Sequence, residues 1–391
     1  MPVIGKTFGA LYLSAAVLQF GATLLISHLA LRLGAGGASE LRIGALMAAN
    51  ALGMAIGASA GRTLIERIGH VRTFAATTGL MVAAVLAHEL GTALPFWIVL
   101  RAVAGMALMT QVMALESWLN DRAGALQRGR VLAGYMVATY AGMMLGQVGV
   151  AAGGGAGPGG GTVIVVAIAF ACCVIPVAMT RMPPPAALPQ AGITFGQIVR
   201  RVPRPLATVF VSGMLNSSFF GLAAIYAAQH RMSPGATAVY LACPVVAGLL
   251  AQFPLGVLSD RLPRLVLVRG VAVLLALASA VLCTGDSMPM AALLGFACCA
   301  GALQFCLYPL GVAWANGLVD PAMRVGLAGV LLTTFAIGSC IGPLLAGAWM
   351  SEAGASSLYA FFAACAVALV LATGRERQGA ALGPAIGHAD S

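Results

Sequence analysis

Charged side chains are scarce in this chain of 391 residues. They make up 8% of the sequence, whereas 60% of the residues are hydrophobic. A soluble domain carries about 25% charged residues, so too few remain here to cover a globular surface. The scarcity excludes an ordinary soluble domain and indicates that most of the chain lies in lipid.

The sequence also lacks the patterns of catalytic and metal sites. The nine cysteines include no C-x-x-C pair, and most of them fall inside apolar runs, where a small side chain suits helix packing. The glycine-rich stretch 152–161 has no Lys-Ser/Thr after it and is therefore not a phosphate loop. No nucleophile lies beside a base in the sequence. We therefore expect no enzyme activity, no cofactor and no bound metal.

What the sequence does contain is a series of twelve apolar runs, from about Thr7–Leu31 to Ser356–Thr373. Each is about 19 residues or longer, which as a helix crosses a hydrocarbon core of about 30 Å. We therefore predict an all-α membrane protein with twelve transmembrane helices, embedded in the lipid bilayer. An even number of spans places both termini on the same side.

The basic residues are divided unevenly between the two sets of helix ends. Seventeen lie at the termini and in the even-numbered loops, whereas only Arg32, Arg42 and Arg231 lie on the opposite side. Positive charge collects on the cytoplasmic side of membrane proteins. We therefore expect a bacterial inner (plasma) membrane protein with both termini in the cytoplasm. This placement explains the net charge of +10 without a nucleic-acid partner.

Short motifs recur about half a chain apart. Glu66 and Asp260 are 194 residues apart, Trp118 and Trp314 are 196 apart, and the Leu-Ala-Gly runs at 132 and 327 are 195 apart. Such a period indicates a duplicated unit. We predict two pseudo-symmetric six-helix bundles, residues 1–181 and 206–374. A cytoplasmic linker, 182–205, joins them and includes a short amphipathic helix; a disordered cytoplasmic tail, 375–391, follows.

The loop motifs resemble those of the major facilitator superfamily. The family signature after the second helix is G-x-L-x-D-R-x-G-R-R/K, and the copy around Glu66 is a degraded version of it. The fourth apolar run contains the family's R-x-x-x-G at Arg101 and Gly105. It ends in ESWLN, residues 116–120, which is similar to a poorly characterised bacterial subgroup of these transporters. The second copy of the signature matches at Gly256, Leu258, Asp260, Arg261 and Arg264.

The resemblance implies alternating access between two halves and a latch between their cytoplasmic ends. An acidic residue in the repeated loop could face the N-terminus of a helix in the other half, where unpaired N–H groups favour an anion. The arginines of the loop could reach acidic residues at the end of the fourth helix. The alternative is that these arginines only keep the loop inside. The expected latch residues are Glu66, Arg67, Arg72, Glu116, Asp121, Asp260 and Arg261.

Polar residues within the apolar runs are candidates for substrate contacts. Arg101 lies about six residues inside the fourth run, or about 9 Å deep, where an unpaired charge costs several kcal/mol. It could bind a substrate carboxylate, or it could be a structural arginine bonded to the first helix. In the family that the chain resembles, helices 1, 4, 7 and 10 line the cavity. The expected substrate-binding residues are Arg101, Gln19, Asn216, Gln304, Tyr308 and Tyr140.

The sequence thus predicts a secondary active transporter that moves a small organic solute, acting as a monomer. No Asp or Glu falls at mid-membrane, since Glu116 is near the cytoplasmic surface and Glu89 near the external one. This argues against a cationic drug and favours a neutral, amphipathic or anionic solute. The sequence leaves proton coupling and export open. The alternative is a non-transporting membrane sensor or partner-binding protein with the same fold.

Overall fold

The computed structural model describes residues 2–122, 128–152, 161–180, 195–284, 288–319 and 324–374. Within these ranges the chain forms thirteen helices and no strand. Eleven of these helices are long and apolar enough to cross a membrane. The remaining two are the seven-residue α7 and α5, in which several side chains lie outside the described residues. The structure supports an all-helical multi-pass protein, and the count of twelve spans stays a prediction.

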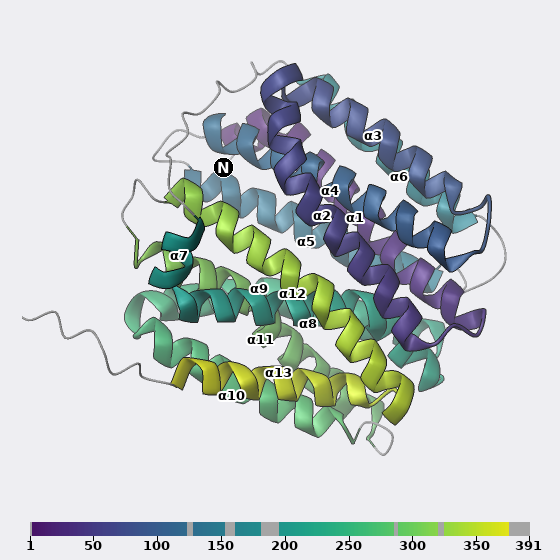
Figure 1. Cartoon of the computed structure of the whole chain (residues 1–391), viewed down its shortest axis with the longest axis vertical. Helices are drawn as coiled ribbons and strands as arrows, with labels where there is room; N and C mark the ends of the chain where they lie inside the picture. Colours follow the sequence, from purple (N-terminus) through teal and green to yellow (C-terminus); the bar gives the residue numbers. More distant parts are fainter. Residues whose placement is uncertain are drawn as a thin grey trace, which may run out of the picture.

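The first six helices gather in one part of the molecule, in the upper half of Figure 1. Their order along the chain follows the predicted runs, and their ends differ from the prediction by a few residues. They are α1 (Pro2–Ala35), α2 (Glu40–Ile68), α3 (His70–Ala87), α4 (Leu94–Arg122), α5 (Arg128–Ala152) and α6 (Gly161–Ala178).

The last six helices gather in the lower half of the same view. The seven-residue α7 (Phe195–Arg201) precedes them, where the sequence predicts a short amphipathic helix. The predicted tail, 375–391, and most of the linker lie outside the described residues. The six helices are α8 (Pro203–Gln229), α9 (Pro234–Arg261), α10 (Arg264–Leu282), α11 (Met290–Asn316), α12 (Arg324–Ala353) and α13 (Ser357–Gly374).

Glycines bring the long helices into backbone contact. A methyl group on Gly53 of α2 would overlap the Ala102 carbonyl of α4, and one on Gly105 would overlap the Asn50 carbonyl. In the second group of helices, Gly338 of α12 faces the Phe210 carbonyl of α8 in the same way. In a membrane, where burial between helices gains little from the hydrophobic effect, such close approach is what stabilises helix pairs. These glycines therefore contribute to the packing of the α2–α4 and α8–α12 pairs.

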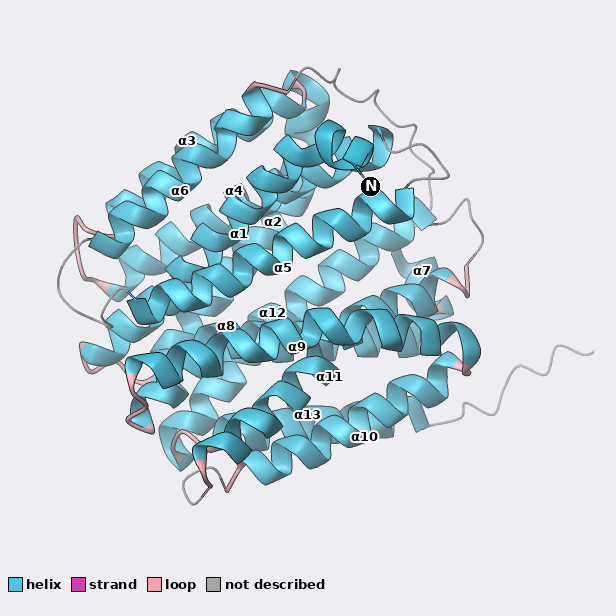
Figure 2. Ribbon diagram, turned by 180° about the vertical axis from the view of Figure 1, so that it is seen from behind, coloured by secondary structure: helices cyan, strands magenta, loops and turns pink. Residues whose placement is uncertain are grey.

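The helices of both groups run between the same two ends of the molecule, as the reverse view in Figure 2 also shows. The Glu40 end carries the α1–α2 connection at 36–39 and the α8–α9 connection at 230–233. The His70 end carries the α2–α3 turn, where Gly69 has φ +81°, and the α9–α10 turn at 262–263.

Candidate functional site

An aromatic cluster joins the two groups of helices near the middle of the molecule. Tyr140 lies at the centre of α5, and its ring meets Phe305 of α11 edge-on, with centroids 6.2 Å apart. Phe305 also contacts Phe219 and Phe220 of α8, with centroids 5.8 and 5.6 Å apart. Aromatic pairs prefer such edge-on arrangements. The cluster provides a large apolar surface shared by the two halves.

Amide groups surround this aromatic cluster. The Tyr140 hydroxyl is hydrogen-bonded to the Gln252 side chain of α9. Gln304 precedes Phe305 in α11 and is 1% exposed, and its Oε1 has no hydrogen-bond partner among the described residues. Within the same part of the chain, Asn216, one helical turn before Phe219, has an unpartnered Oδ1. Buried polar atoms are rarely left without a partner, so these two oxygens are suited to accept hydrogen bonds from a solute.

The other predicted cavity residues on α1 and α11 are less directly placed. Gln19 of α1 is half-buried. Tyr308 lies one turn from Phe305 toward the His70 end and packs edge-on against Phe335 of α12, with centroids 5.0 Å apart. The structure therefore gathers Tyr140, Asn216 and Gln304 around the aromatic cluster and places Tyr308 just beyond it.

A carboxyl group lies between this cluster and the His70 end. Glu116 falls within the apolar part of α4, Leu94–Leu119, and its side chain is half-buried. The Tyr135 hydroxyl of α5, whose side chain is 3% exposed, is hydrogen-bonded to it. Tyr308 of α11 lies within electrostatic range of the same carboxyl. The sequence predicts Glu116 near a membrane surface. In the structure the phenol groups of Tyr135, from the first half, and Tyr308, from the second, lie near its carboxyl.

At the Glu40 end the two halves are joined directly. The Glu40 side chain of α2 accepts hydrogen bonds from Gln229 Nε2 of α8, at 2.6 Å, and from Ser351 Oγ of α12, at 3.1 Å. The Leu41 backbone N–H donates to the same Ser351 hydroxyl. Gly44 of α2 also lies directly against the Pro343 carbonyl of α12. Glu40 therefore connects one half to two helices of the other.

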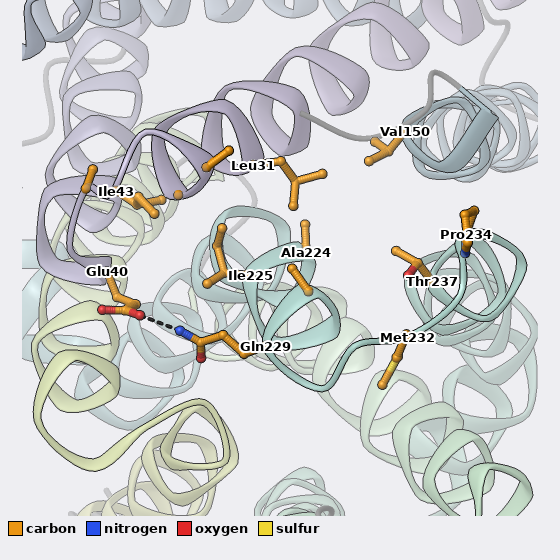
Figure 3. A pocket seen from close by; sticks show the side chains of 14 residues that line it. Leu31, Glu40, Ile43, Val150, Ala224, Ile225, Gln229, Met232, Pro234 and Thr237 are labelled. Atoms are coloured by element: carbon orange, nitrogen blue, oxygen red, sulfur yellow. Dashed lines mark hydrogen bonds between the residues drawn. The ribbon is translucent and has the colours of Figure 1, made fainter. Parts of the chain in front are cut away.

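A cavity of about 450 Å³ opens beside this connection. Figure 3 shows Glu40 bonded to Gln229 at one side of the cavity and Pro234 and Thr237 at the opposite side. The walls between them are mainly apolar and come from α1, α2, α5, α8 and α9. The cavity thus lies at the outer mouth of the interface between the halves, at the Glu40 end.

The family follows from a comparison with known proteins. A family model described as Major Facilitator Superfamily matches residues 9–243 and 206–384 of this chain. The chain belongs to the major facilitator superfamily. Among curated relatives it is 27% identical, over 74% of both chains, to the uncharacterized MFS-type transporter YcaD of Salmonella enteritidis. It is 28% identical, over the same shares, to YcaD of Salmonella dublin.

Solved structures of several transporters share the fold. The nucleoside transporter NupG superposes with a TM-score of 0.76 at 14% identity, covering 93% of this chain and 98% of NupG. A bacterial homologue of the human lysosomal transporter Spinster, in an inward-facing and occupied conformation, gives 0.75 at 17% identity, with 95% and 96% covered. A D-xylose–proton symporter gives 0.73 at 15%, with 94% and 96% covered. By family the chain therefore belongs to a superfamily of membrane transporters.

The superfamily's loop signature lies at the His70 end. Glu66 accepts a hydrogen bond from Arg62 of its own helix at 3.0 Å, and both side chains are 46% exposed. Arg67, Arg72 and Arg261 are exposed. The side chains of Asp121 and Asp260 lie outside the described parts of the structure. The latch therefore stays a prediction, and Glu66 is paired within α2 in this conformation.

The superfamily's R-x-x-x-G motif places Arg101 near the Glu40 end, about 10 Å into α4. Its side chain is 2% exposed, and in the described ranges neither Nε nor Nη2 has a hydrogen-bond partner. Its charge acts on His88, at the end of α3. Arg101 is fifteen residues from Glu116 on α4, or about 22 Å along the helix axis. Arg101 and Glu116 therefore belong to separate sites.

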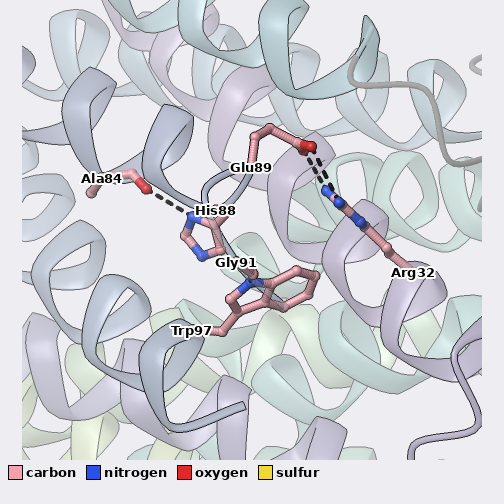
Figure 4. A network of polar contacts seen from close by, with 6 residues as sticks. All are labelled: Arg32, Ala84, His88, Glu89, Gly91 and Trp97. Atoms are coloured by element: carbon pink, nitrogen blue, oxygen red, sulfur yellow. Dashed lines mark hydrogen bonds and ion pairs between the residues drawn. The ribbon is translucent and has the colours of Figure 1, made fainter. Parts of the chain in front are cut away.

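Figure 4 shows the polar network around His88, on which the charge of Arg101 acts. Arg32 forms an ion pair with Glu89 and lies over the Trp97 ring, 5.3 Å from its centroid. His88 packs edge-on against Trp97, and its Nδ1 lies 2.8 Å from the Ala84 carbonyl. Burial, followed by the charge of Arg101, lowers the pKa of His88 to about 4. The ring is therefore neutral at physiological pH, and Nδ1–H donates to Ala84.

Sequence reasoning missed Glu40, and it counted Gln252 and Tyr135 among the polar residues within the spans without selecting them as site residues. Glu40 follows Ser39 at a helix start, where an acidic residue usually serves only the helix dipole. Gln252 and Tyr135 were polar residues of apolar runs without a known partner. Their contacts, to Tyr140 and Glu116, cross from one helix to another. The sequence shows that each of these two residues is polar and lies within a span, but it does not show which residue of another helix it contacts.

Proposed function

We propose that this protein is a secondary active transporter that carries a small organic solute across the bacterial inner membrane by alternating access. The observation that carries the proposal is the connection of Glu40 to Gln229 and Ser351, which holds the halves together at one end. With the Glu40 end outside and the His70 end in the cytoplasm, as the basic residues predict, this conformation is closed to the outside.

The site for the solute is the aromatic cluster with its surrounding amides. An apolar ring or chain of the solute packs against Tyr140, Phe220 and Phe305, and its polar groups bond to Gln304 and Asn216. The aromatic surface and the unpartnered oxygens support an amphipathic solute with hydrogen-bond donors. The nucleoside and xylose transporters of the same fold carry solutes that are small and polar. Gln19 and Tyr308 complete the proposed site.

The latch at the His70 end belongs to the opposite conformation. When the Glu40 connection opens, Glu66, Arg67 and Arg72 of the first half approach the second half, and Asp260 and Arg261 approach the first. In this role the Glu66–Arg62 pair breaks and Glu66 takes a partner across the interface. Coupling to protons and export driven by the proton gradient are part of the same proposal.

The first experiment measures thermal stability of the purified protein against a panel of metabolites and drugs. A ligand that binds the folded state raises the melting temperature by mass action. The shift should be lost in Phe305→Leu and kept in Phe253→Leu, because Phe253 is 81% exposed on α9. A shift lost in Arg101→Ala instead would place an anionic solute beside Arg101.

Transport is then measured with the ligand that gave the shift, in proteoliposomes of the full chain. Uptake or efflux that depends on Phe305 and not on Phe253 supports the proposed site. A ligand that binds without being transported would overturn the transporter proposal and favour a membrane sensor or partner-binding protein.

A further inference from the structure

The cavity beside Glu40 lies apart from the aromatic cluster. On α8 it is lined by Ala224 and Ile225, and both side chains are buried. Ala224 is four residues beyond Phe220 of the cluster, or about 6 Å along the helix axis. Neither Tyr140 nor Phe305 is among the described residues that line the cavity. The cavity is therefore a second place where a molecule can be held.

Both halves contribute to the apolar wall of this cavity. Leu31 of α1 and Ile43 of α2 come from the first half, and Ile225 of α8 comes from the second. In Figure 3 the Leu31 and Ile225 side chains lie between Glu40 on one side and Thr237 on the other. The volume of about 450 Å³ falls within the range of small-molecule sites, about 300–1,000 Å³. A molecule held there contacts both halves at once.

Glu40 gives the cavity a negative charge. The two side chains that donate to its carboxylate, those of Gln229 and Ser351, are neutral. In the part of the chain that the structure describes, no cation forms an ion pair with it. The start of α2 offsets about half of the charge, so the carboxylate remains a net anion. A carboxylate has about four acceptor positions, and these two bonds leave room for a further donor.

The other charged side chains at this end do not change that polarity. Arg32 is paired with Glu89, and Arg42 and Arg231 are exposed. Among the described residues that line the cavity, Glu40 is the only charged one. The cavity is therefore apolar with a single anionic group at its edge.

The opposite wall of the cavity, at the start of α9, offers little to an anion. The Ser233 hydroxyl already accepts a hydrogen bond from the Ala236 N–H. The Thr237 N–H donates to the Ser233 carbonyl, and Pro234 has no N–H to donate. A ligand that suits both walls therefore has an apolar body and one positive group, which lies against Glu40.

We propose that this cavity binds a small alkylammonium ion, whose N–H groups donate to Glu40 and whose apolar body packs against Leu31 and Ile225. The occupant contacts both halves in the conformation that is closed at the Glu40 end. A ligand that binds this conformation alone raises its population by a factor of one plus the ratio of ligand concentration to Kd. The ion therefore acts as a brake on opening. Its binding does not rest on the proposed function, whereas the brake on transport does.

The test uses three probes with the same apolar cage and different polar groups: adamantylammonium, adamantanol and adamantane carboxylate. Their Kd values for the purified full chain are obtained from the rise in melting temperature with probe concentration, at about pH 7, where the amine is protonated. The ammonium should bind about tenfold more tightly than the alcohol, and the carboxylate should bind more weakly than the alcohol. Equal binding of the three would indicate partition onto apolar surface and overturn the proposal.

Glu40→Gln removes the charge and keeps a carbonyl oxygen for the Gln229 amide. Its preference for the ammonium over the alcohol should disappear. A change in the closed population affects both probes equally, so the ratio of their affinities reports the charge. Glu352→Gln, the same change at an exposed position of α12, should keep the preference. A Glu40→Gln variant that still prefers the ammonium overturns the proposal.

Two further variants locate the bound probe. Ala228→Leu enlarges an exposed side chain that lines the cavity, so both ammonium and alcohol should bind several-fold more weakly. Ala75→Leu, the same change at an exposed position of α3, should leave both affinities unchanged. Phe305→Leu should also leave them unchanged. Loss of ammonium binding in Phe305→Leu alone would place the probe in the aromatic cluster and overturn the proposal.

The brake is measured with spin labels on α2 and α12 at the Glu40 end. With adamantylammonium at about ten times its Kd, the ratio of closed to open molecules should rise about tenfold. An unchanged ratio would overturn the brake. Failure of the proposed function is seen separately, as absence of transport of any bound solute in proteoliposomes, and it leaves the ammonium site standing.

Discussion

His70 and Arg264 occupy equivalent positions in the two halves. Each links two neighbouring helices by a hydrogen bond, one through an imidazole and the other through a guanidinium group. His70 begins α3, and its Nε2 lies 2.9 Å from Ser117 Oγ near the end of α4. Arg264 begins α10 and donates to the Ala313 carbonyl near the end of α11. The two basic residues are 194 residues apart in the sequence, and their two partners are 196 apart. Each half therefore ties its third helix to its fourth at the His70 end.

Removing either tie should destabilise its own half. Arg264→Met takes a cation away from carbonyls at a helix C-terminus, an interaction worth about 0.5–2 kcal/mol, and His70→Phe should cost about 1 kcal/mol. The melting temperature in detergent measures both. Arg42→Met, at an exposed arginine, should leave it unchanged. Because the ties lie in different halves, the double variant should show the sum of the two losses; strong non-additivity would contradict separate ties.

The Glu40 connection should set how often the Glu40 end opens. Glu40→Ala removes the carboxylate that accepts hydrogen bonds from α8 and α12, and each such bond is worth about 1.5–3 kcal/mol. The population that is open at the Glu40 end should therefore rise tenfold or more. Distances between spin labels on α2 and α12 measure this rise. Glu352→Ala removes a carboxylate from the same end of α12 and serves as control. Equal effects of the two changes would mean that local charge, and not the bonds to Gln229 and Ser351, holds the end closed.

Replacing a glycine with alanine should lower stability where the glycine contacts another helix closely and raise it where the glycine faces open space. Gly53→Ala places a methyl group against the Ala102 carbonyl, and such overpacking costs about 1–3 kcal/mol. Gly79→Ala in α3 meets nothing within 4 Å, and it should stabilise the helix by about 0.5–1 kcal/mol. Thermal melts of the two variants should therefore move in opposite directions. A Gly53→Ala melt like that of the original chain would contradict the close α2–α4 contact.

Acid should weaken the fold through His88. Its pKa of about 4 in the folded protein lies below the ordinary value of 6.5, so the unfolded chain takes up a proton first as the pH falls. Stability is complete above about pH 6.5 and should decline toward pH 4. His88→Gln keeps a donor for the Ala84 carbonyl and removes the titration, so its melting temperature should fall less over this range. An identical acid dependence in both proteins would exclude His88 as a cause.

The fold was largely predictable because its signals belong to single segments. Run length and basic residues indicate an all-helical membrane protein, and repeated loop motifs indicate two related halves. The candidate site was predictable only in part. Tyr140 and Gln304 were selected as polar residues within spans, and the structure places both at the aromatic cluster. Glu40 was not selected, because its partners lie 189 and 311 residues away.

Glu116 is a second residue whose surroundings could not be predicted from the sequence. Its position along α4 was read correctly as near the end of the span. Whether such a carboxyl faces water, lipid or another helix depends on how α4 and α5 cross. That crossing is set by many small side chains at once, and no single motif encodes it.

The backbone contact of Gly44 with Pro343 has a kinetic consequence. Where bulky side chains interlock, two surfaces separate only after many rotamers change together. α2 and α12 meet here through Gly44 and the Pro343 carbonyl oxygen. The side chain of glycine is a single hydrogen atom, so it has no rotamer to change. Separation at this point is a smooth withdrawal of one helix from another. In the proposed opening of this end, Gly44 therefore has no side chain that must change rotamer, and we expect the hydrogen bonds of Glu40 to limit the rate.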